Sequence, residues 1–169
     1  IKENGPTWHM SKQGTPTMGG LMFIAAIAVV CLSVGFDCMA EGEYGHLFCL
    51  AFALVFGAIG FLDDYEKLKK KQNLGLTAGK KILLQLAAAV AFIFLMRRFG
   101  YVALDSLYIP FWNKTVPISE PLYVIFAAFV IVGTVNSVNL TDGVDGLAAS
   151  TTMPVCIFFA AVSYTHLTL

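Results

Sequence analysis

Hydrophobic residues in this chain are gathered into long blocks and do not recur singly at helical or strand spacing. A helix needs about 20 apolar residues to cross the hydrocarbon core of a bilayer, with about 17 as a lower limit. Backbone polar groups in lipid must be satisfied within their own segment, so the blocks predict helices. The predicted spans are 19–36, 46–62, 82–99, 121–135 and 147–163. The fourth reaches full length only if it takes in Asn136 and Ser137.

The composition indicates the same class of protein. Of 169 residues, 57% are hydrophobic and 13% are charged, whereas soluble domains carry about 25% charged residues. The sequence therefore predicts an all-α, polytopic integral membrane protein. The formal net charge is zero, so no basic surface points to nucleic acid as a partner. The four cysteines form no C-x-x-C pair and are expected to be small lipid-facing or core-facing residues.

Basic residues are divided unequally between the two sides of these spans. A Lys/Arg excess marks cytoplasmic loops, and the 63–81 loop holds six lysines, whereas the 37–45 loop holds three acids and no basic residue. The segment before the first span and the 63–81 loop are therefore predicted to be cytoplasmic. Parity then places 136–146 inside and 97–120 outside. Eight of the eleven basic residues fall on the cytoplasmic side, the exceptions being Arg97, Arg98 and Lys114.

Three polar, glycine-bearing segments share this predicted cytoplasmic face: "SKQGTPTMGG", "DDYEKLKKKQNLGLTAGKK" and "NSVNLTDGVDGLA". A purely structural membrane protein has no need to gather its unusual residues on one side. We therefore expect a functional site at the cytoplasmic membrane surface.

The first element of this site is the pair Asp63 and Asp64, which directly follows the second predicted span. An acid at the membrane boundary is a functional candidate, because an acid at the bilayer centre costs about 2.5–3.5 kcal/mol. Adjacent carboxylates repel each other, so the pKa of one should rise unless a cation sits between them. On a continuing helix, Lys67 lies within reach of both. Such a group suits holding Mg²⁺, positioning a phosphate or taking a proton, and an interfacial cap with water-exposed charge explains it equally well.

The second element is the N-x-x-N-x-x-D-G-x-D-G run, formed by Asn136, Asn139, Asp142 and Asp145 with their glycines. On an unbroken helix each step of three residues falls about 60° short of a turn, so the first and last side chains would face opposite sides. The glycines allow the chain to leave helical geometry, and we expect a helix end that curls so that the four side chains converge. Amides and carboxylates together suit a nucleobase and ribose, or a metal. The alternative is a solvated turn.

The third element precedes the first span. Lys12, Thr15 and Thr17 could contact a phosphate at the membrane surface. A turn leading into a helix through Gly19 and Gly20 explains this segment as well, and the segment by itself favours the plain turn.

Together, "GPTWHMSKQGTPTMGG", "GFLDDYEK", "GLTAGKK" and "NSVNLTDGVDGLA" resemble the phospho-N-acetylmuramoyl-pentapeptide-transferase family. These are bacterial enzymes of the polyprenyl-phosphate N-acetylhexosamine-1-phosphate transferase superfamily. The first and last motifs are specific in length, order and separation, and the resemblance runs to about Val162. It implies a ten-helix membrane enzyme of which five helices are present. It also implies transfer of phospho-N-acetylmuramoyl-pentapeptide from its UDP carrier to undecaprenyl phosphate, with Mg²⁺, and release of UMP.

The resemblance further implies roles for individual residues. Asp63 and Asp64 match the catalytic acid pair, one of them a candidate for deprotonating the lipid phosphate, and both are expected beside Mg²⁺. Lys81 is chosen over Lys80 because it lies six residues after Gly75, the spacing of the family. The residues expected to contact substrate are Lys12, Thr17, Lys67, Lys81, Asn136, Asn139, Asp142 and Asp145.

The same resemblance implies that the chain is an N-terminal half. The family's later Mg²⁺-binding aspartate and its histidine-rich motif have no counterpart. Residues 1–162 are expected to be half of one transmembrane transferase domain, and the closing "SYTHLTL", 163–169, a truncation scar or non-native tail. Such a fragment is expected to be inactive. The implied location is the bacterial inner membrane, with the site facing the cytoplasm, and a homodimer is one implied assembly.

Two other functions stay open. A sister transferase using UDP-N-acetylglucosamine shares the Asp-Asp pair and the asparagine–aspartate run, but resembles "TPTMGG" less well. A membrane transporter usually places ionisable groups and broken helices near the bilayer midplane. The five predicted spans carry no acid or lysine in their interiors, which argues against a transporter.

Overall fold

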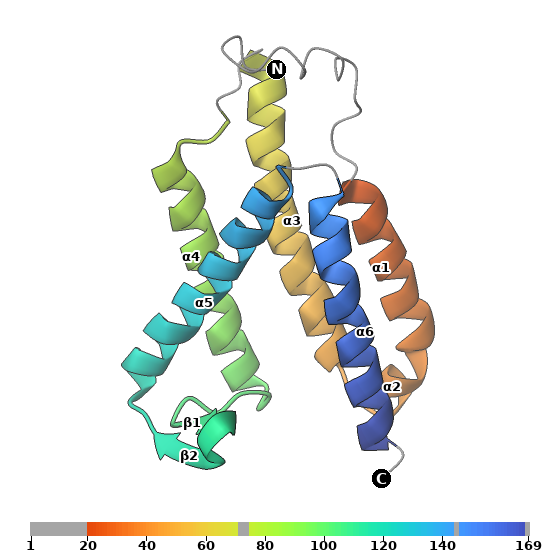
Figure 1. Ribbon diagram of the computed structural model, residues 1–169, viewed down its shortest axis with the longest axis vertical. Helices are drawn as coiled ribbons and strands as arrows, with labels where there is room; N and C mark the ends of the chain where they lie inside the picture. The colour runs from red at the N-terminus through yellow and green to blue at the C-terminus, as the bar shows by residue number, and fades with distance from the viewer. Residues whose placement is uncertain (1–19, 71–74, 144–145, 168–169) are drawn as a thin grey trace. The chain divides into compact units, whose positions relative to one another are not determined.

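The chain folds into apolar helices joined by short polar segments and one β-hairpin (Figure 1). The computed structural model describes residues 20–70, 75–143 and 146–167. The helices are α1 Gly20–Val34, α2 Phe36–Ala40, α3 Gly45–Lys70, α4 Ala78–Arg98, α5 Glu120–Thr141 and α6 Leu147–Leu167. Between α4 and α5 lie β1 Ser106–Ile109, the 3-10 turn Pro110–Trp112 and β2 Lys114–Pro117.

Helices α3, α4, α5 and α6 are long and apolar enough to cross a membrane. Four of the five predicted spans are therefore confirmed, and with them the helical, polytopic class. α5 runs through Asn136 and Ser137 to Thr141, which brings the fourth span to 22 residues. α3 continues past the predicted end of the second span, so Asp63 and Asp64 lie on the helix.

The first predicted span, 19–36, is longer than the helix that the structure contains. α1 has 15 residues and ends at Val34, and Gly35 separates it from the five residues of α2. A Cβ at Gly35 would lie 2.3 Å from the carbonyl oxygen of Cys31 and 2.4 Å from Nε2 of His46. His46 therefore packs directly against the backbone here, where only glycine leaves room.

The pattern of apolar blocks does not predict the hairpin between α4 and α5. Its strands have four residues each and pair antiparallel, with Ile109 opposite Lys114 at the turn. Asn113 adopts a φ of 47° there, a left-handed conformation that asparagine accepts more readily than most residues. The hydroxyl of Tyr108 donates a hydrogen bond of 2.7 Å to Oδ1 of Asn113, which holds the turn.

The chain divides into two compact units, 1–128 and 129–169, and each is described by itself. In the first unit, α1 and α4 pack on α3 (Figure 1). α3 and α4 meet through Phe52 and Phe92, whose stacked rings have centroids 4.0 Å apart. The buried apolar residues here include Ile59, Ala89 and Ile93. In the second unit, none of the described residues of α6 up to Tyr164 is buried.

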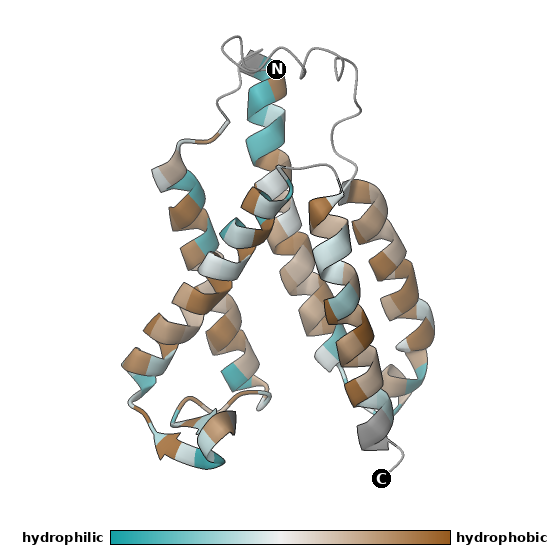
Figure 2. Cartoon of the chain, in the orientation of Figure 1, coloured by the Kyte–Doolittle hydropathy of each residue, from teal (hydrophilic) through white to brown (hydrophobic). Residues whose placement is uncertain are grey.

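Hydrophobic residues make up most of the helices (Figure 2). Many of their large apolar side chains are exposed and are not confined to a core. Exposed apolar surface of this extent marks contact with a membrane or a partner. Hydrophilic residues gather toward the C-terminal end of α3 (Figure 2), the part of the helix that carries Asp63 and Asp64. The fold therefore places a polar, charged end on an otherwise apolar helix.

Gly57 lies where α1 packs on α3. A Cβ at this position would lie 2.8 Å from Cδ1 of Ile24, whereas a Cβ at Gly60 would meet no atom within 4 Å. We expect Gly57→Leu to push the helices apart and lower stability by about 1–3 kcal/mol, the usual cost of overpacking. Gly60→Leu is the matched control, and its melting temperature in detergent should stay near that of the unsubstituted chain. Equal losses in both variants would contradict this packing.

Candidate active site

Asp63 is buried near the C-terminal end of α3, with 7% of its surface exposed. Among the described residues it is the only buried one that can carry a charge. Its Oδ1 accepts a hydrogen bond of 2.9 Å from the backbone N–H of Leu76. Its Oδ2 lies 2.9 Å from Nζ of Lys67 and 3.5 Å from Nζ of Lys81. A buried carboxylate is costly unless it is paired and hydrogen-bonded, and these three donors compensate it.

Lys67 joins Asp63 to its neighbour. Its Nζ lies 2.9 Å from Oδ2 of Asp63 and 2.9 Å from Oδ1 of Asp64. Residues three and four positions apart face each other on a helix, so one ammonium group reaches both acids. Of the two alternatives, a raised pKa or an intervening cation, the structure contains the cation. We call Asp63, Asp64, Lys67 and Lys81 the acid–lysine cluster; its two carboxylates and two ammonium groups balance in charge.

Lys81 reaches the cluster from the first turn of α4. Its backbone N–H donates a hydrogen bond of 3.0 Å to the carbonyl of Thr77, and its side chain is 18% exposed. Lys80 beside it is exposed. The structure thus brings Lys81, the lysine chosen from the sequence spacing, to Asp63. The role of Lys81 in binding substrate stays a prediction.

Gly75 is a structural part of this site that the sequence analysis missed. A Cβ at this position would lie 2.4 Å from Oδ1 of Asp63, 2.5 Å from its carbonyl oxygen and 2.9 Å from Cε of Lys67. Only a residue without a side chain lets the link to α4 lie against the acid, where Leu76 can donate its N–H. In the sequence, Gly75 of "GLTAGKK" provides only the six-residue spacing to Lys81. Nothing in a single sequence marks Gly75 as a contact of Asp63.

Asp64 differs from Asp63 in its surroundings. Successive helical residues are about 100° apart around the axis, so Asp64 turns away from α4. Its side chain is 47% exposed and borders a groove of about 200 Å³ between α1 and α3. The groove is lined by Gly20, Leu21, Ile24, Gly57, Gly60, Phe61 and Asp64. One carboxylate therefore faces an otherwise apolar groove.

The asparagine–aspartate run departs from the expected geometry. α5 is continuous to Thr141, so Asn136 and Asn139 lie on an unbroken helix and the chain turns only at Asp142. The prediction that the helix curls within the run is wrong from Asn136 to Thr141. The helical backbone hydrogen bonds continue up to the one that the N–H of Asp142 donates to the carbonyl of Val138, at 3.1 Å. Nδ2 of Asn136 donates to the carbonyl of Val132 at 2.8 Å. Asn139 and Asp142 are exposed.

Three of the expected site residues, Lys12, Thr17 and Asp145, lie outside the described residues. Asn136, Asn139 and Asp142 belong to the second unit, and the acid–lysine cluster belongs to the first. The structure itself brings together the acid–lysine cluster and the backbone of residues 75–77, the link that precedes α4.

The two acids of the cluster differ in how well they suit a metal ion. Within residues 20–70, 75–143 and 146–167, no group of three or more histidine, cysteine, aspartate or glutamate residues is placed to hold a metal ion. Both oxygens of Asp63 are engaged by donors, which does not suit a ligand. Asp64 is partly exposed and pairs through Oδ1. Mg²⁺ in phosphate chemistry needs only one or two protein carboxylates besides water and phosphate, so Asp64 fits as one ligand.

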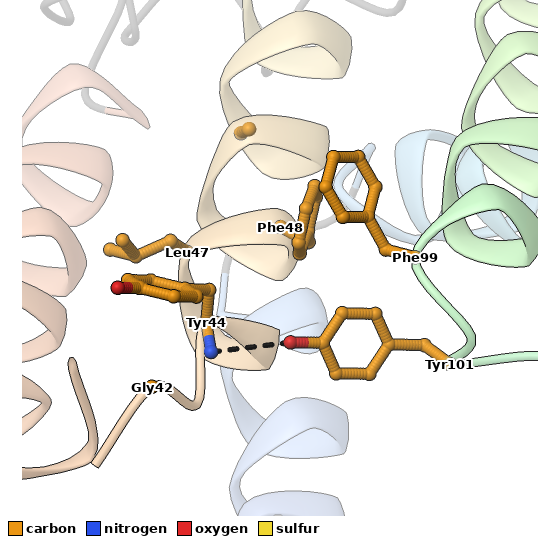
Figure 3. Close-up of a pocket in the computed structure, with 7 residues that line it drawn as sticks. Gly42, Tyr44, Leu47, Phe48, Phe99 and Tyr101 are labelled. Atoms are coloured by element: carbon orange, nitrogen blue, oxygen red, sulfur yellow. Dashed lines mark hydrogen bonds between the residues drawn. The ribbon is translucent and has the colours of Figure 1, made fainter.

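A larger pocket lies at the other end of α3 and α4 (Figure 3). Its volume is about 550 Å³, and it is lined by Gly42, Tyr44, Leu47, Phe48, Ala51, Phe99 and Tyr101. The backbone N–H of Tyr44 donates to the hydroxyl of Tyr101 at 3.2 Å, and the ring of Phe48 lies 4.8 Å from that of Phe99. The lining carries no carboxylate, amine or imidazole, so it does not suit acid–base chemistry.

These observations define a class of protein: a multi-pass helical membrane protein with a compensated pair of acids at the end of one span. The chain belongs to glycosyl transferase family 4, whose sequence model matches residues 46–168. A signature of phospho-N-acetylmuramoyl-pentapeptide-transferases, signature 1, matches residues 12–24.

Similar proteins support the same relationship. The chain is 40% identical over 165 residues to a phospho-N-acetylmuramoyl-pentapeptide-transferase of Staphylococcus carnosus. It is 42% identical over 165 residues to the protein of that name from Staphylococcus aureus. Each match covers 97% of this chain and 50% of the relative, so the chain spans about half the length of these curated relatives. The resemblance inferred from the motifs is confirmed.

The contact between Gly75 and Asp63 can be tested directly. We expect Gly75→Ala to displace the link before α4, break the Leu76–Asp63 hydrogen bond and lower stability by about 1–3 kcal/mol. Gly79→Ala is the matched control, because a Cβ there meets no atom within 4 Å and alanine favours the helix. Thermal unfolding in detergent should show a lower melting temperature for the first variant alone. A stable Gly75→Ala chain would rule out the close approach.

Proposed function

We propose that the chain is part of an enzyme that transfers phospho-N-acetylmuramoyl-pentapeptide from its UDP carrier to undecaprenyl phosphate and releases UMP. The observation that carries the proposal is the acid–lysine cluster at the end of an apolar span, with Asp64 open to an apolar groove. The matched signature and the names of the two relatives give the transferred group, phospho-N-acetylmuramoyl-pentapeptide. The motif resemblance implies its UDP carrier and the undecaprenyl phosphate acceptor.

The cluster suits this chemistry because phosphoryl transfer depends mainly on positioning and charge neutralisation. Lys67 and Lys81 supply two ammonium groups within a few ångströms of the acids, where they can neutralise the charge of an incoming phosphate. The groove beside Asp64 is apolar on its other sides, as the isoprenoid end of a lipid phosphate requires. Asp64 is then the acid exposed to the reacting groups, and Asp63 holds the lysines and the link before α4.

Mg²⁺ is the proposed cofactor. Bound at the site, it would neutralise phosphate charge in the transition state. Asp64 would supply one oxygen ligand, with phosphate, water and residues outside this chain supplying others. Asp63 would act by keeping Lys67 and Lys81 in place.

The nucleotide end of the substrate is assigned to the asparagine–aspartate run. Asn139 and Asp142 are exposed near the end of α5, where amide and carboxylate groups can bind a nucleobase and ribose. Asn136, Asp145, Lys12 and Thr17 keep their predicted roles in binding substrate. The matched signature favours this reading over a sister transferase using UDP-N-acetylglucosamine, and membership of a transferase family favours it over a transporter.

The enzyme is proposed to lie in the bacterial cytoplasmic membrane with this site on the cytoplasmic side. The lysines of 63–81 support that orientation, because basic loops stay on the cytoplasmic face. A cytosolic sugar nucleotide and a membrane lipid can meet there.

The function predicts a defined exchange reaction. The full-length enzyme should exchange labelled UMP into UDP-N-acetylmuramoyl-pentapeptide only when Mg²⁺ and undecaprenyl phosphate are both present. Asp64→Asn should lower kcat about 10²- to 10⁴-fold, the usual loss when an acid–base group is removed, while the melting temperature stays close to normal. Asp63→Asn should lower both activity and melting temperature, because it leaves two lysines without their buried partner.

Asp37→Asn is the control for these substitutions, since Asp37 is an exposed acid on α2 and should leave the exchange unchanged. Exchange supported by UDP-N-acetylglucosamine instead would indicate the sister transferase. No exchange with either sugar nucleotide in a stable preparation would refute the proposed reaction.

The orientation predicts which positions face the cytoplasm. Single cysteines replacing Lys80, Lys114 and Asp142 in a cysteine-free chain should react differently with a membrane-impermeant maleimide. In intact spheroplasts only position 114 should be labelled, and positions 80 and 142 should react after permeabilisation. Labelling of 80 and 142 from opposite faces would separate the two halves of the proposed site and contradict it.

A further inference from the structure

The tip of the β-hairpin exposes two large aromatic side chains. Phe111 is 97% exposed and Trp112 is 72% exposed. Tyr108 and Val116, on the two strands below them, are 56% and 42% exposed. The acid–lysine cluster lies on other elements, and the proposed reaction gives these residues no role.

The base of the hairpin is attached to the ends of two spanning helices. α4 ends at Arg98 and α5 begins at Glu120, and an ion pair between Arg97 and Glu120 ties these ends together. The backbone N–H of Ile118 donates to the carbonyl of Asp105 at 2.9 Å, which closes the base. A four-residue strand is about 13 Å long, so the tip stays within reach of the membrane surface from which both helices emerge.

The turn presents its aromatic residues outward. Asn113 takes the left-handed conformation, and Tyr108 fixes it through the 2.7 Å hydrogen bond to its side chain. The pairing of Ile109 with Lys114 continues up to this turn. Phe111 and Trp112 therefore project from a defined loop.

Two basic residues lie on the hairpin and at its base. Arg98 at the end of α4 and Lys114 next to the turn are both exposed, and they are two of the three basic residues that the predicted topology leaves outside. Cationic side chains suit the phosphate groups of phospholipids, and tryptophan is enriched at the headgroup level of membranes.

We propose that the hairpin tip, Phe111 and Trp112, is a membrane-surface anchor that inserts into the headgroup region of the leaflet beside the ends of α4 and α5. The unpaired backbone groups of the hairpin limit how deep the tip can enter the membrane. A two-stranded hairpin has open edges, and open sheet edges do not occur in the hydrocarbon region. The aromatic rings therefore enter the interface, while the strands stay above the acyl chains.

Tryptophan fluorescence tests this placement. The chain has two tryptophans, Trp8 and Trp112, so Trp8→Phe leaves Trp112 as the single reporter. In phosphatidylglycerol-containing vesicles, lipids brominated near the headgroup should quench its emission at least twofold more than lipids brominated near the chain ends. Aqueous iodide should quench it weakly, and its emission should be blue-shifted relative to free tryptophan. Helical circular dichroism checks that the variant is folded.

Each other outcome overturns the anchor. Strong quenching by iodide without quenching by brominated lipid would place the tip in water. Protection from both quenchers would mean that protein, from a second copy or from a longer form of the chain, covers the tip. Stronger quenching by the deep label would contradict the interfacial depth. A second variant, Trp8→Phe with Tyr108→Phe, removes the hydrogen bond to Asn113 and should raise iodide quenching of Trp112 if the fixed turn is what presents the ring.

Discussion

The polar end of this molecule depends on one buried carboxylate, whose negative charge must be balanced by hydrogen-bond donors and cations. Asp63 receives a backbone hydrogen bond from Leu76 and ion pairs from Lys67 and Lys81. These donors come from α3 itself, from the link that follows it and from the first turn of α4. Removing the charge from water is costly unless it is paired and hydrogen-bonded, so the chain has to bring all three segments to the acid. The link can approach only because Gly75 has no side chain.

This requirement gives two neighbouring acids different environments. Asp63 faces α4 and is nearly enclosed, whereas Asp64, one residue further around the helix, is 47% exposed beside an apolar groove. Lys67 contacts both and couples their positions. An Asp-Asp pair on a helix thus combines a fixed, structural carboxylate with an accessible one, without any break in the helix. That is a physical basis for assigning different tasks to adjacent, chemically identical residues.

The two ends of the first unit differ in chemistry. One end gathers lysines and acids around α3. The other end also carries charges, such as the Arg97–Glu120 pair, and adds aromatic rings: Phe48 contacts Phe99 and Tyr101, and Trp112 lies on the hairpin. A helix that crosses a bilayer meets water at both ends but needs different residues at each. Charged groups suit a site that binds phosphates, and aromatic rings suit a position at the headgroup level.

The sequence by itself determined the class of protein, the positions of four spans, the family and the reach of Lys67 to both acids. These follow from block length, from residue counts and from helical spacing, which are all local properties. The sequence alone did not determine that α1 ends at Val34, that α5 stays helical through Asn139, or that a hairpin closes the segment between α4 and α5. It also did not separate Asp63 from Asp64 or reveal Gly75. Those features depend on which backbone or side chain lies across from a residue, as His46 lies against Gly35 and Asp63 against Gly75. Only the tertiary structure decides such contacts, because they join residues whose separation along the chain carries no pattern.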